Sequence, residues 1–281
     1  MNMKYKFLLS LFISQSIFAS TQLVILGSGT PNPNPERGGS AYAVIVDNTP
    51  YLVDFGPGAI RSFAALMPAW GGGMKEMDVT KIEHAFLTHI HSDHTTGLSD
   101  LLLTPWIMGR ENKLNLYGPK GLEKMAGSLL DAYADDIDYR VNGTQPSNGT
   151  GYQFNFTELA DGVVFQDINL KVEAFKVNHG DFEDAYGFRF TSKDKVIVFS
   201  GDTGPSKSLE RYAKALKFLA LLVTQSLQPH KSKYDDLYDK SASPWFFLRI
   251  LHLNKPRALG YLHLSHIFLE ILRDPYLQRI L

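Results

Sequence analysis

The 281-residue chain contains no cysteine. Disulfide bonds are therefore excluded, and a zinc site would have to use histidine nitrogens and carboxylate oxygens. An excess of charge is also missing, since 28 Lys and Arg residues against 29 Asp and Glu residues leave a formal net charge of −1. No stripe of basic residues stands out, so the usual electrostatic signature of nucleic-acid binding is lacking. We therefore do not expect nucleic acid as a partner.

A hydrophobic run long enough to span a bilayer is likewise absent at the N-terminus. Lys4 and Lys6 precede an apolar run from Phe7 to Ile17, and Ala19 supplies a small residue after it. This is the pattern of a secretory signal peptide, and the run is too short for a membrane anchor. We expect residues 1–19 to be removed and residues 20–281 to form the mature domain. The expected location is the periplasm or the outside of the cell, with no membrane partner after cleavage.

The signal peptide makes a direct prediction about the mature protein. Protein recovered from its native source should begin near Ser20, because cleavage follows the small residue Ala19. Determination of the N-terminus by sequencing or intact mass tests this. Cytoplasmic material that still carries Met1 would contradict it.

Beyond the leader, apolar runs of strand length alternate with helical patterns. We expect helices over 59–67, 98–108 and 121–133, and strands over 21–29, 40–47, 50–56, 85–87, 113–118, 163–166, 169–177, 186–191 and 195–200. The polar segment NGTQPSNGTGYQ, residues 142–153, is predicted to be a mobile loop. No linker of distinct composition divides the chain. The order of elements favours a single α/β domain with two sheet-containing halves.

Three of the nine histidines fall within the short segment FLTHIHSDHTTGL, residues 86–98. An apolar run leads into the segment, which predicts a buried strand that ends in a polar turn, followed by a helix. Alternate residues of an extended turn point the same way, so His89 and His91 can bind one metal ion. Asp93 and His94 can then face a second ion. Histidines that lie near one another in a sequence by chance rarely have this spacing.

Two further residues at strand ends are candidate ligands. His179 ends an alternating strand in FKVNHGDFEDAYGFRF, and Asp202 follows an apolar strand in KVIVFSGDTGPS. A single histidine at a strand end is usually only solvated, and Asp before Thr-Gly is a good turn residue. Their shared position at the ends of strands is the reason to consider them as ligands.

These motifs together resemble the metallo-β-lactamase superfamily, and most closely its branch that contains tRNase Z and arylsulfatase-like hydrolases. The resemblance implies an αββα sandwich with two zinc ions at the rim between the sheets. It implies that His89, His91 and His179 bind the first ion and that Asp93 and His94 bind the second. Asp202 would bridge both, Asp54 would support the site without binding metal, and Asp93 and Asp202 are the candidate catalytic residues. The segments that carry the resemblance are LGSGTPNPNPERGGS, YLVDFGPG, THIHSDHTTGL, LNLYGPKGLEKM, VNHGDFEDAYGFRF and VFSGDTGPS.

The C-terminal part, from about residue 220, diverges from the family. A strand that ends in His-Glu is expected after Asp202, but LLVTQSLQPH lacks this pair. Alignment of the tail puts Ser241 at the position of the family's proton-donating histidine and His263 at the last metal ligand. His266 is the rival for that position.

The resemblance implies a hydrolase that uses a hydroxide shared by two zinc ions. We expect a secreted or periplasmic enzyme that cleaves a phosphodiester, sulfate ester or related bond of a small-molecule ester. The alternatives are a tRNA 3′-processing endoribonuclease and a non-catalytic metal-binding relative. Only a short span separates Phe190 from Val196, where tRNA-processing members often carry an arm that grips tRNA. The sequence leaves the formation of a homo-oligomer open.

Overall fold

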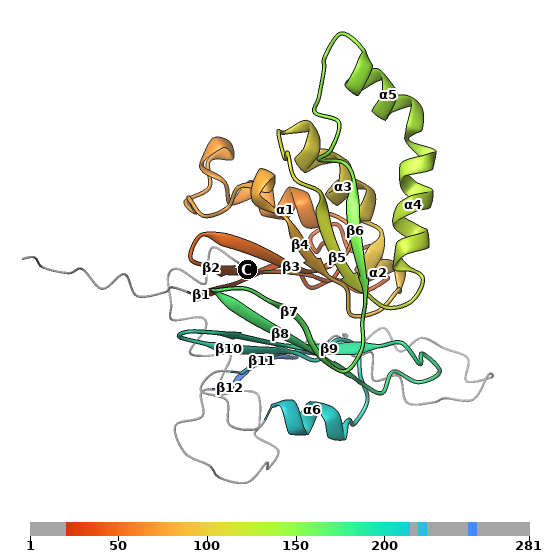
Figure 1. Cartoon of the computed structure of the whole chain (residues 1–281). Coiled ribbons are helices and arrows are strands. Elements are labelled where there is room, and N and C mark those ends of the chain that lie inside the picture. The colour runs from red at the N-terminus through yellow and green to blue at the C-terminus, as the bar shows by residue number, and fades with distance from the viewer. Residues whose placement is uncertain (1–20, 214–218, 224–246, 252–281) are drawn as a thin grey trace, which may run out of the picture.

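Strand β2, Ala41–Val46, shows how the layers of the molecule are built. Side chains of a strand point alternately to the two faces of its sheet. In the computed structural model, which describes residues 21–213, 219–223 and 247–251, every residue of β2 is buried. Ala41, Ala43 and Ile45 lie in the core under the helices. The intervening residues lie in a second core, between two sheets. A strand that is apolar on both faces therefore implies a layer on each side, and the fold is the expected αββα sandwich (Figure 1).

The first sheet has six strands in the order β1-β2-β3-β4-β5-β6. Strands β1 to β3 are antiparallel, whereas β3 to β6 run parallel. The turn between β2 and β3 is made by Asp47 and Asn48, both at positive φ. Asn and Asp tolerate this conformation, which suits a tight hairpin. The strands are β1 Thr21–Gly27, β2, β3 Thr49–Phe55, β4 His84–Phe86, β5 Leu114–Gly118 and β6 Phe154–Glu158.

The second sheet is antiparallel, with four strands in the order β10-β9-β8-β7. Its strands are β7 Gly162–Gln166, β8 Leu170–Lys176, β9 Tyr186–Ser192 and β10 Val196–Phe199, close to the expected ranges. A separate antiparallel pair is formed by β11 Leu219–Val223 and β12 Phe247–Leu251. The two large sheets pack through aromatic side chains, among which Phe86 meets Phe188 and Phe190 edge-on. This inter-sheet core holds the two halves of the domain together.

Helices cover the outer faces of both sheets (Figure 1). The six-stranded sheet is covered by α1 Ala59–Ala65, α3 Leu98–Ile107 and α4 Leu122–Ala132, and the four-stranded sheet by α6 Lys207–Tyr212. The remaining helices are α2 Ser92–Thr95, α5 Ala134–Asn142 and the short 3-10 turns η1 Pro68–Trp70 and η2 Val79–Lys81. The sequence did not predict β6, α5 or α6. Helix α5 is rich in aspartate, which is a weak helix former, and its Asp136 pairs with Arg140 one turn later.

The segment expected to be a mobile loop, residues 142–153, is partly held in place. Asn148 lies at the centre of the attachment: its side-chain amide donates to the Arg110 carbonyl at 2.9 Å. The indole Nε1 of Trp106 donates to the Asn148 carbonyl at 2.7 Å. Arg110 donates twice to the Gly151 carbonyl. Polar composition therefore marks a loop here, and long-range hydrogen bonds order it.

The predicted leader, residues 1–19, lies outside the described residues. The diverged tail is described only where β11 and β12 run, so Ser241, His263 and His266 also lie outside. Within the described residues, no helix is long and apolar enough to cross a membrane.

Candidate metal centre

The histidine motif lies in the turn that follows β4, where the two sheets meet. Thr88, two residues after the end of β4, accepts a backbone hydrogen bond from Tyr186 of β9 at 2.9 Å. His89 and His91 follow, and α2 then carries Asp93 and His94. The order of buried strand, polar turn and helix is the one that the sequence predicted. Because the two sheets meet here, the loop after β8, which carries His179, and the loop after β10, which carries Asp202, lie next to this turn.

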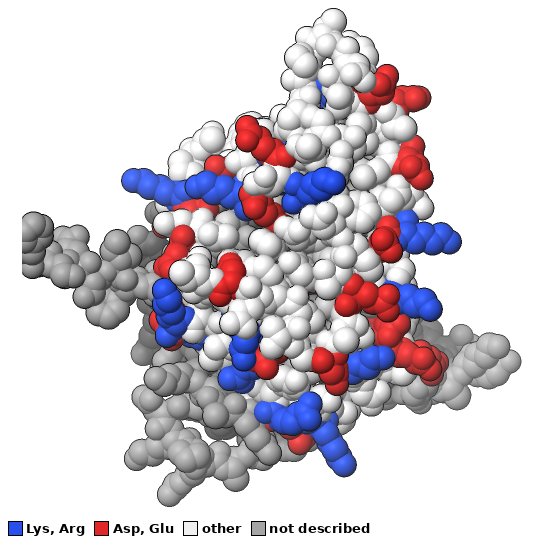
Figure 2. Space-filling view, in the orientation of Figure 1, with Lys and Arg blue, Asp and Glu red and all other residues white. Residues whose placement is uncertain are grey.

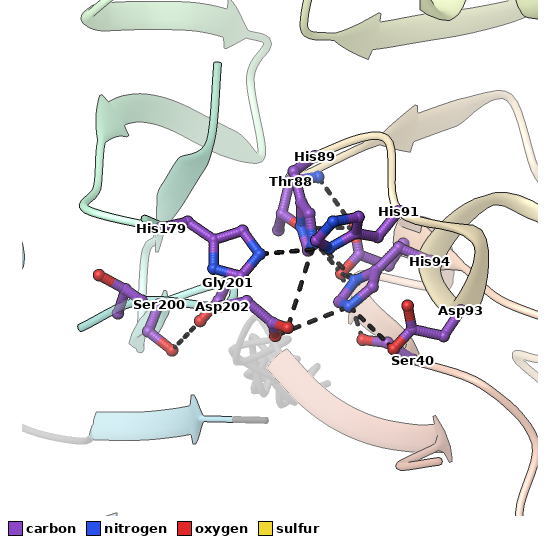
Figure 3. Close-up of polar contacts among 12 residues, drawn as sticks. Ser40, Thr88, His89, His91, Asp93, His94, His179, Ser200, Gly201 and Asp202 are labelled. Carbon is purple, nitrogen blue, oxygen red and sulfur yellow. Dashed lines mark hydrogen bonds and ion pairs between the residues drawn. The ribbon is translucent and has the colours of Figure 1, made fainter. Parts of the chain in front are cut away.

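Four residues form a group whose ligand atoms all lie within 4.8 Å of one another: His89, His91, His179 and Asp202 (Figure 3). His91 Nδ1 lies 2.9 Å from His89 Nε2 and 3.2 Å from His179 Nε2. Nitrogens bound to one tetrahedral zinc ion lie about 3.3 Å apart, given Zn–N bonds of about 2.0–2.1 Å. The three rings therefore converge as ligands of one ion would.

Asp93 and His94 form the second half of the centre. Nε2 of His94 lies 3.6 Å from an Asp93 oxygen and 3.6 Å from Oδ1 of Asp202. The other Asp202 oxygen, Oδ2, lies 4.0 Å from Nε2 of His89. One carboxylate thus turns one oxygen to each half. Nε2 of His94 is buried without a hydrogen-bond partner among the described residues, which fits a metal ligand and no other evident role.

Behind these ligands, Asp54 and Thr88 hold two imidazoles in one tautomer each. Asp54, at φ 56°, accepts hydrogen bonds from Thr88 N at 2.8 Å and Thr88 Oγ1 at 3.0 Å. Its Oδ2 lies 2.7 Å from Nδ1 of His94. Because Thr88 donates to Asp54, its oxygen is free to accept from Nδ1 of His89 at 3.0 Å. Both Nδ1 atoms then carry a proton, so Nε2 is the nitrogen that each ring directs to the centre for binding metal. The sequence placed Asp54 in this supporting role through the family resemblance and missed Thr88.

The charges of the site follow from burial and these contacts. Burial, with the neighbouring rings of His94, His179 and His91, lowers the pKa of His89 to about 2, so its ring is neutral and ready to bind metal. Burial also acts to lower the pKa of His94, but the carboxylates of Asp54, Asp202 and Asp93 together outweigh it and raise that pKa to about 9. Without metal, His94 is therefore protonated at neutral pH. A metal ion must displace this proton, so acid competes with metal at this ligand.

The loop that carries Asp202 is fixed by close backbone contacts. Gly201 has φ 59°, and a Cβ at this position would lie 2.7 Å from the Tyr186 carbonyl oxygen. Asn178 accepts hydrogen bonds from Gly204 N at 2.7 Å and Thr203 Oγ1 at 3.2 Å. These bonds tie the Asp202 loop to the loop of His179. The segment SGDTG signalled a turn, but only the structure shows why glycine is needed at position 201.

The structure thus brings together six of the seven expected ligands, and the seventh, His263, lies outside the described residues. His84 is not among these ligands: it is the first residue of β4 and packs against Tyr51 and Phe165. Phe182, which the sequence did not single out, lies against the ligand rings, with its centroid 4.3 Å from that of His91.

Comparison with known proteins identifies relatives of this fold. The sequence profile of the Beta-lactamase superfamily domain matches residues 49–261. Ribonuclease Z of Mycolicibacterium gilvum is 29% identical over 195 residues, which cover 68% of this chain and 65% of that protein. Ribonuclease Z of Mycobacterium marinum is also 29% identical over 195 residues, which cover 68% of this chain and 66% of that protein. The chain thus spans just under two thirds of the length of these relatives.

Solved structures show the same fold. Human tRNase Z, short form, has a TM-score of 0.53 and 21% identity, covering 66% of this chain and 70% of that one. The metallo-β-lactamase fold protein YhfI of Bacillus subtilis has a TM-score of 0.53 and 15% identity, covering 71% and 70%. At these identities the likeness concerns the fold alone.

The relatives correct the expectation about partners. A small-molecule ester was expected as the substrate and nucleic acid was not, but the curated relatives are ribonucleases and one fold neighbour is a tRNase. The argument from a net charge of −1 was wrong because the sum over a chain does not report how charge is distributed on its surface. From the profile match over residues 49–261 and the αββα fold, we conclude that the chain belongs to the metallo-β-lactamase superfamily of hydrolases.

Proposed function

We propose that this protein is a metal-dependent endoribonuclease that cleaves a phosphodiester bond of precursor tRNA. The Ribonuclease Z relatives support the choice of substrate. The observation that carries the proposal is the position of Asp202, whose two oxygens face His89 at 4.0 Å and His94 at 3.6 Å. A carboxylate shared between two sets of donors is what a site for two adjacent cations requires, and such sites suit phosphodiester hydrolysis.

We further propose zinc as the metal, with two ions per chain. Zinc accepts nitrogen and carboxylate ligands, which are the donors present. The first ion would be held by His89, His91 and His179, the second by Asp93 and His94, and Asp202 would bind both. When bound, the ions would activate water and stabilise the negative charge that develops on the phosphate.

The chain's own residues would orient this chemistry. Asp54 holds the proton of His94 at Nδ1 and so keeps Nε2 free for metal. The carboxylate of Asp202 would place negative charge between two cations that would otherwise repel each other, and Asp93 would add negative charge at the second ion. Asn178 fixes the loop of Asp202 through Gly204 N, so the shared carboxylate is held in place before any ligand binds.

The distribution of charge on the surface limits where RNA could bind. The turn between β9 and β10 consists of residues 193–195 alone, so no arm extends from it. On the face shown in Figure 2, basic and acidic side chains alternate without a continuous basic stripe. We therefore expect RNA to be gripped close to the metal centre or through another face. Its affinity should fall as salt rises, because phosphate contacts release counterions.

Cleavage of precursor tRNA by the purified protein tests the proposal. A tRNA with a 3′ trailer should be cut once, with added Zn²⁺ and not in the presence of EDTA, and an unstructured RNA of equal length should be cut more slowly. The variant His84→Gln is a matched control, because His84 lies in β4, before the histidine turn, and packs on Phe165 instead of facing the metal centre. Turnover of bis-p-nitrophenyl phosphate without any cleavage of RNA would contradict the proposed substrate.

A further inference from the structure

The histidines of the metal centre are not supported in the same way. His89 and His94 are buried, and each has its outer nitrogen, Nδ1, in a hydrogen bond with the protein. Their partners are Thr88 and Asp54. Hydrogen bonds of this kind fix the direction in which the metal-binding nitrogen points.

His91 and His179 lack such support. Nδ1 of His91 and Nε2 of His179 face the centre, 3.2 Å from each other. Their remaining nitrogens, Nε2 of His91 and Nδ1 of His179, have no hydrogen-bond partner within residues 21–213. Both side chains are also partly exposed. No protein hydrogen bond within these residues therefore orients the two rings from behind.

Phe182 is the side chain in position to orient these rings. Its ring centroid lies 4.3 Å from that of His91, at an interplanar angle of 63°, and 5.7 Å from that of His179. The contact with His91 is edge-to-face, whereas that with His179 is tilted, with an interplanar angle of 36°. Aromatic contacts at these distances favour particular ring orientations. Phe182 is itself anchored: its backbone N–H donates to the His179 carbonyl at 3.1 Å. Its side chain packs against a core cluster of Phe175, Val177, Ala185 and Val198.

We propose that Phe182 is a positioning residue that orients the rings of His91 and His179 for metal. It does by packing what Thr88 and Asp54 do by hydrogen bonding. The inference rests on the metal centre of the proposed function, but not on its RNA substrate. It assigns Phe182 to one ion only, because Phe182 contacts His91 and His179, whereas His94 of the second ion is held by Asp54. Loss of Phe182 therefore weakens the histidine-rich site and spares the other.

Titration of the metal-free chain with Co²⁺ and Zn²⁺, in competition with a chelator, tests this role. In Phe182→Ala, the affinity for one ion should fall about 10- to 100-fold, as is typical when a group supporting a metal ligand is lost. The affinity for the other ion should not change. The visible Co²⁺ spectrum of the weakened site should shift, because ligand orientation changes. Phe182→Tyr, which keeps the ring, should restore both affinity and spectrum.

Two control variants separate this role from a general loss of packing. Val196→Ala removes a side chain that packs on the same core cluster as Phe182. Phe165→Ala removes a phenyl ring that packs on His84, with centroids 4.6 Å apart, instead of on a metal ligand. Neither should change metal affinity. A loss in Val196→Ala as large as that in Phe182→Ala would overturn the role, and so would wild-type affinity and spectrum in Phe182→Ala.

The same titration distinguishes failure of this inference from failure of the proposed function. If the unchanged chain binds no metal, both the metal centre and the role of Phe182 are wrong. If the chain binds metal and only Phe182→Ala is weakened, the role stands even where precursor tRNA is not cleaved. That combination would reject the RNA substrate alone.

Discussion

Replacing Asp202 with alanine should lower the rate of RNA cleavage at least about 100-fold, since loss of a group that merely supports a metal ligand already costs 10–100-fold. Asp202 is the one described residue whose oxygens face both halves of the centre, at 4.0 Å from His89 and 3.6 Å from His94. Its loss removes a negative charge from between two cations, so we expect both ions to be lost. Metal content by atomic absorption and cleavage of precursor tRNA measure the two effects.

His179→Ala is the matched variant for this test. Its Nε2 faces only the histidine-rich half of the centre, 3.2 Å from His91 Nδ1. We expect this variant to lose mainly one ion and to keep the donors Asp93, His94 and Asp202. Cleavage should fall no further than in Asp202→Ala. A protein that loses one ion in both variants would show that Asp202 is not shared.

Replacing Arg110 with methionine should lower the free energy of unfolding by about 3–5 kcal/mol, the range seen when a buried polar network is broken. The Arg110 side chain is buried and makes five hydrogen bonds, all to backbone carbonyls. One of these is Leu101 O, which lacks its helical donor because Pro105, four residues later, has no N–H. Methionine fills similar space but leaves these carbonyls without a donor.

Chemical denaturation of the variant and of a surface control measures this loss. Lys113→Met removes an exposed basic side chain three residues away and should change stability by no more than about 0.5 kcal/mol. Burial lowers the pKa of Arg110 to about 10, so the guanidinium stays charged at neutral pH. Arg110→Lys should recover only part of the loss, since an ammonium group cannot reach carbonyls in several directions at once. A stability equal to that of the wild type in Arg110→Met would show that water replaces these bonds.

Local patterns were enough to predict much of the site and of the fold. Three histidines and an aspartate within six residues come from one turn, so their convergence depends on backbone geometry over a short distance. Strands such as β2 and β8 were predicted because apolar residues at strand spacing identify them without knowledge of their neighbours. Beyond these local patterns, the family motifs implied the sandwich and the roles of His179, Asp202 and Asp54.

Composition was a poor guide where long-range contacts decide. The polar segment around Asn148 was predicted to be mobile, yet Arg110 and Trp106 hold it through hydrogen bonds to residues about 40 positions away. Helix α5 escaped notice because its aspartates favour turns, while Ile137 is buried against the rest of the domain. Net charge misled the choice of substrate for a similar reason, since it is a sum without positions.

The sequence alone determined the donors, the absence of cysteine ligands and the strand–turn–helix that presents the histidines. Only the tertiary structure decided how these donors are divided and supported. The hydrogen bond from the Tyr186 backbone N–H to the Thr88 carbonyl connects the two sheets next to the site. Where the sheets meet, the loops of His179 and Asp202 lie beside the histidine turn. Phe182 then meets His91, 91 positions earlier in the chain, and Asp54 meets His94 across 40 positions. Such contacts depend on how two sheets pack, and no local pattern in the sequence contains that information.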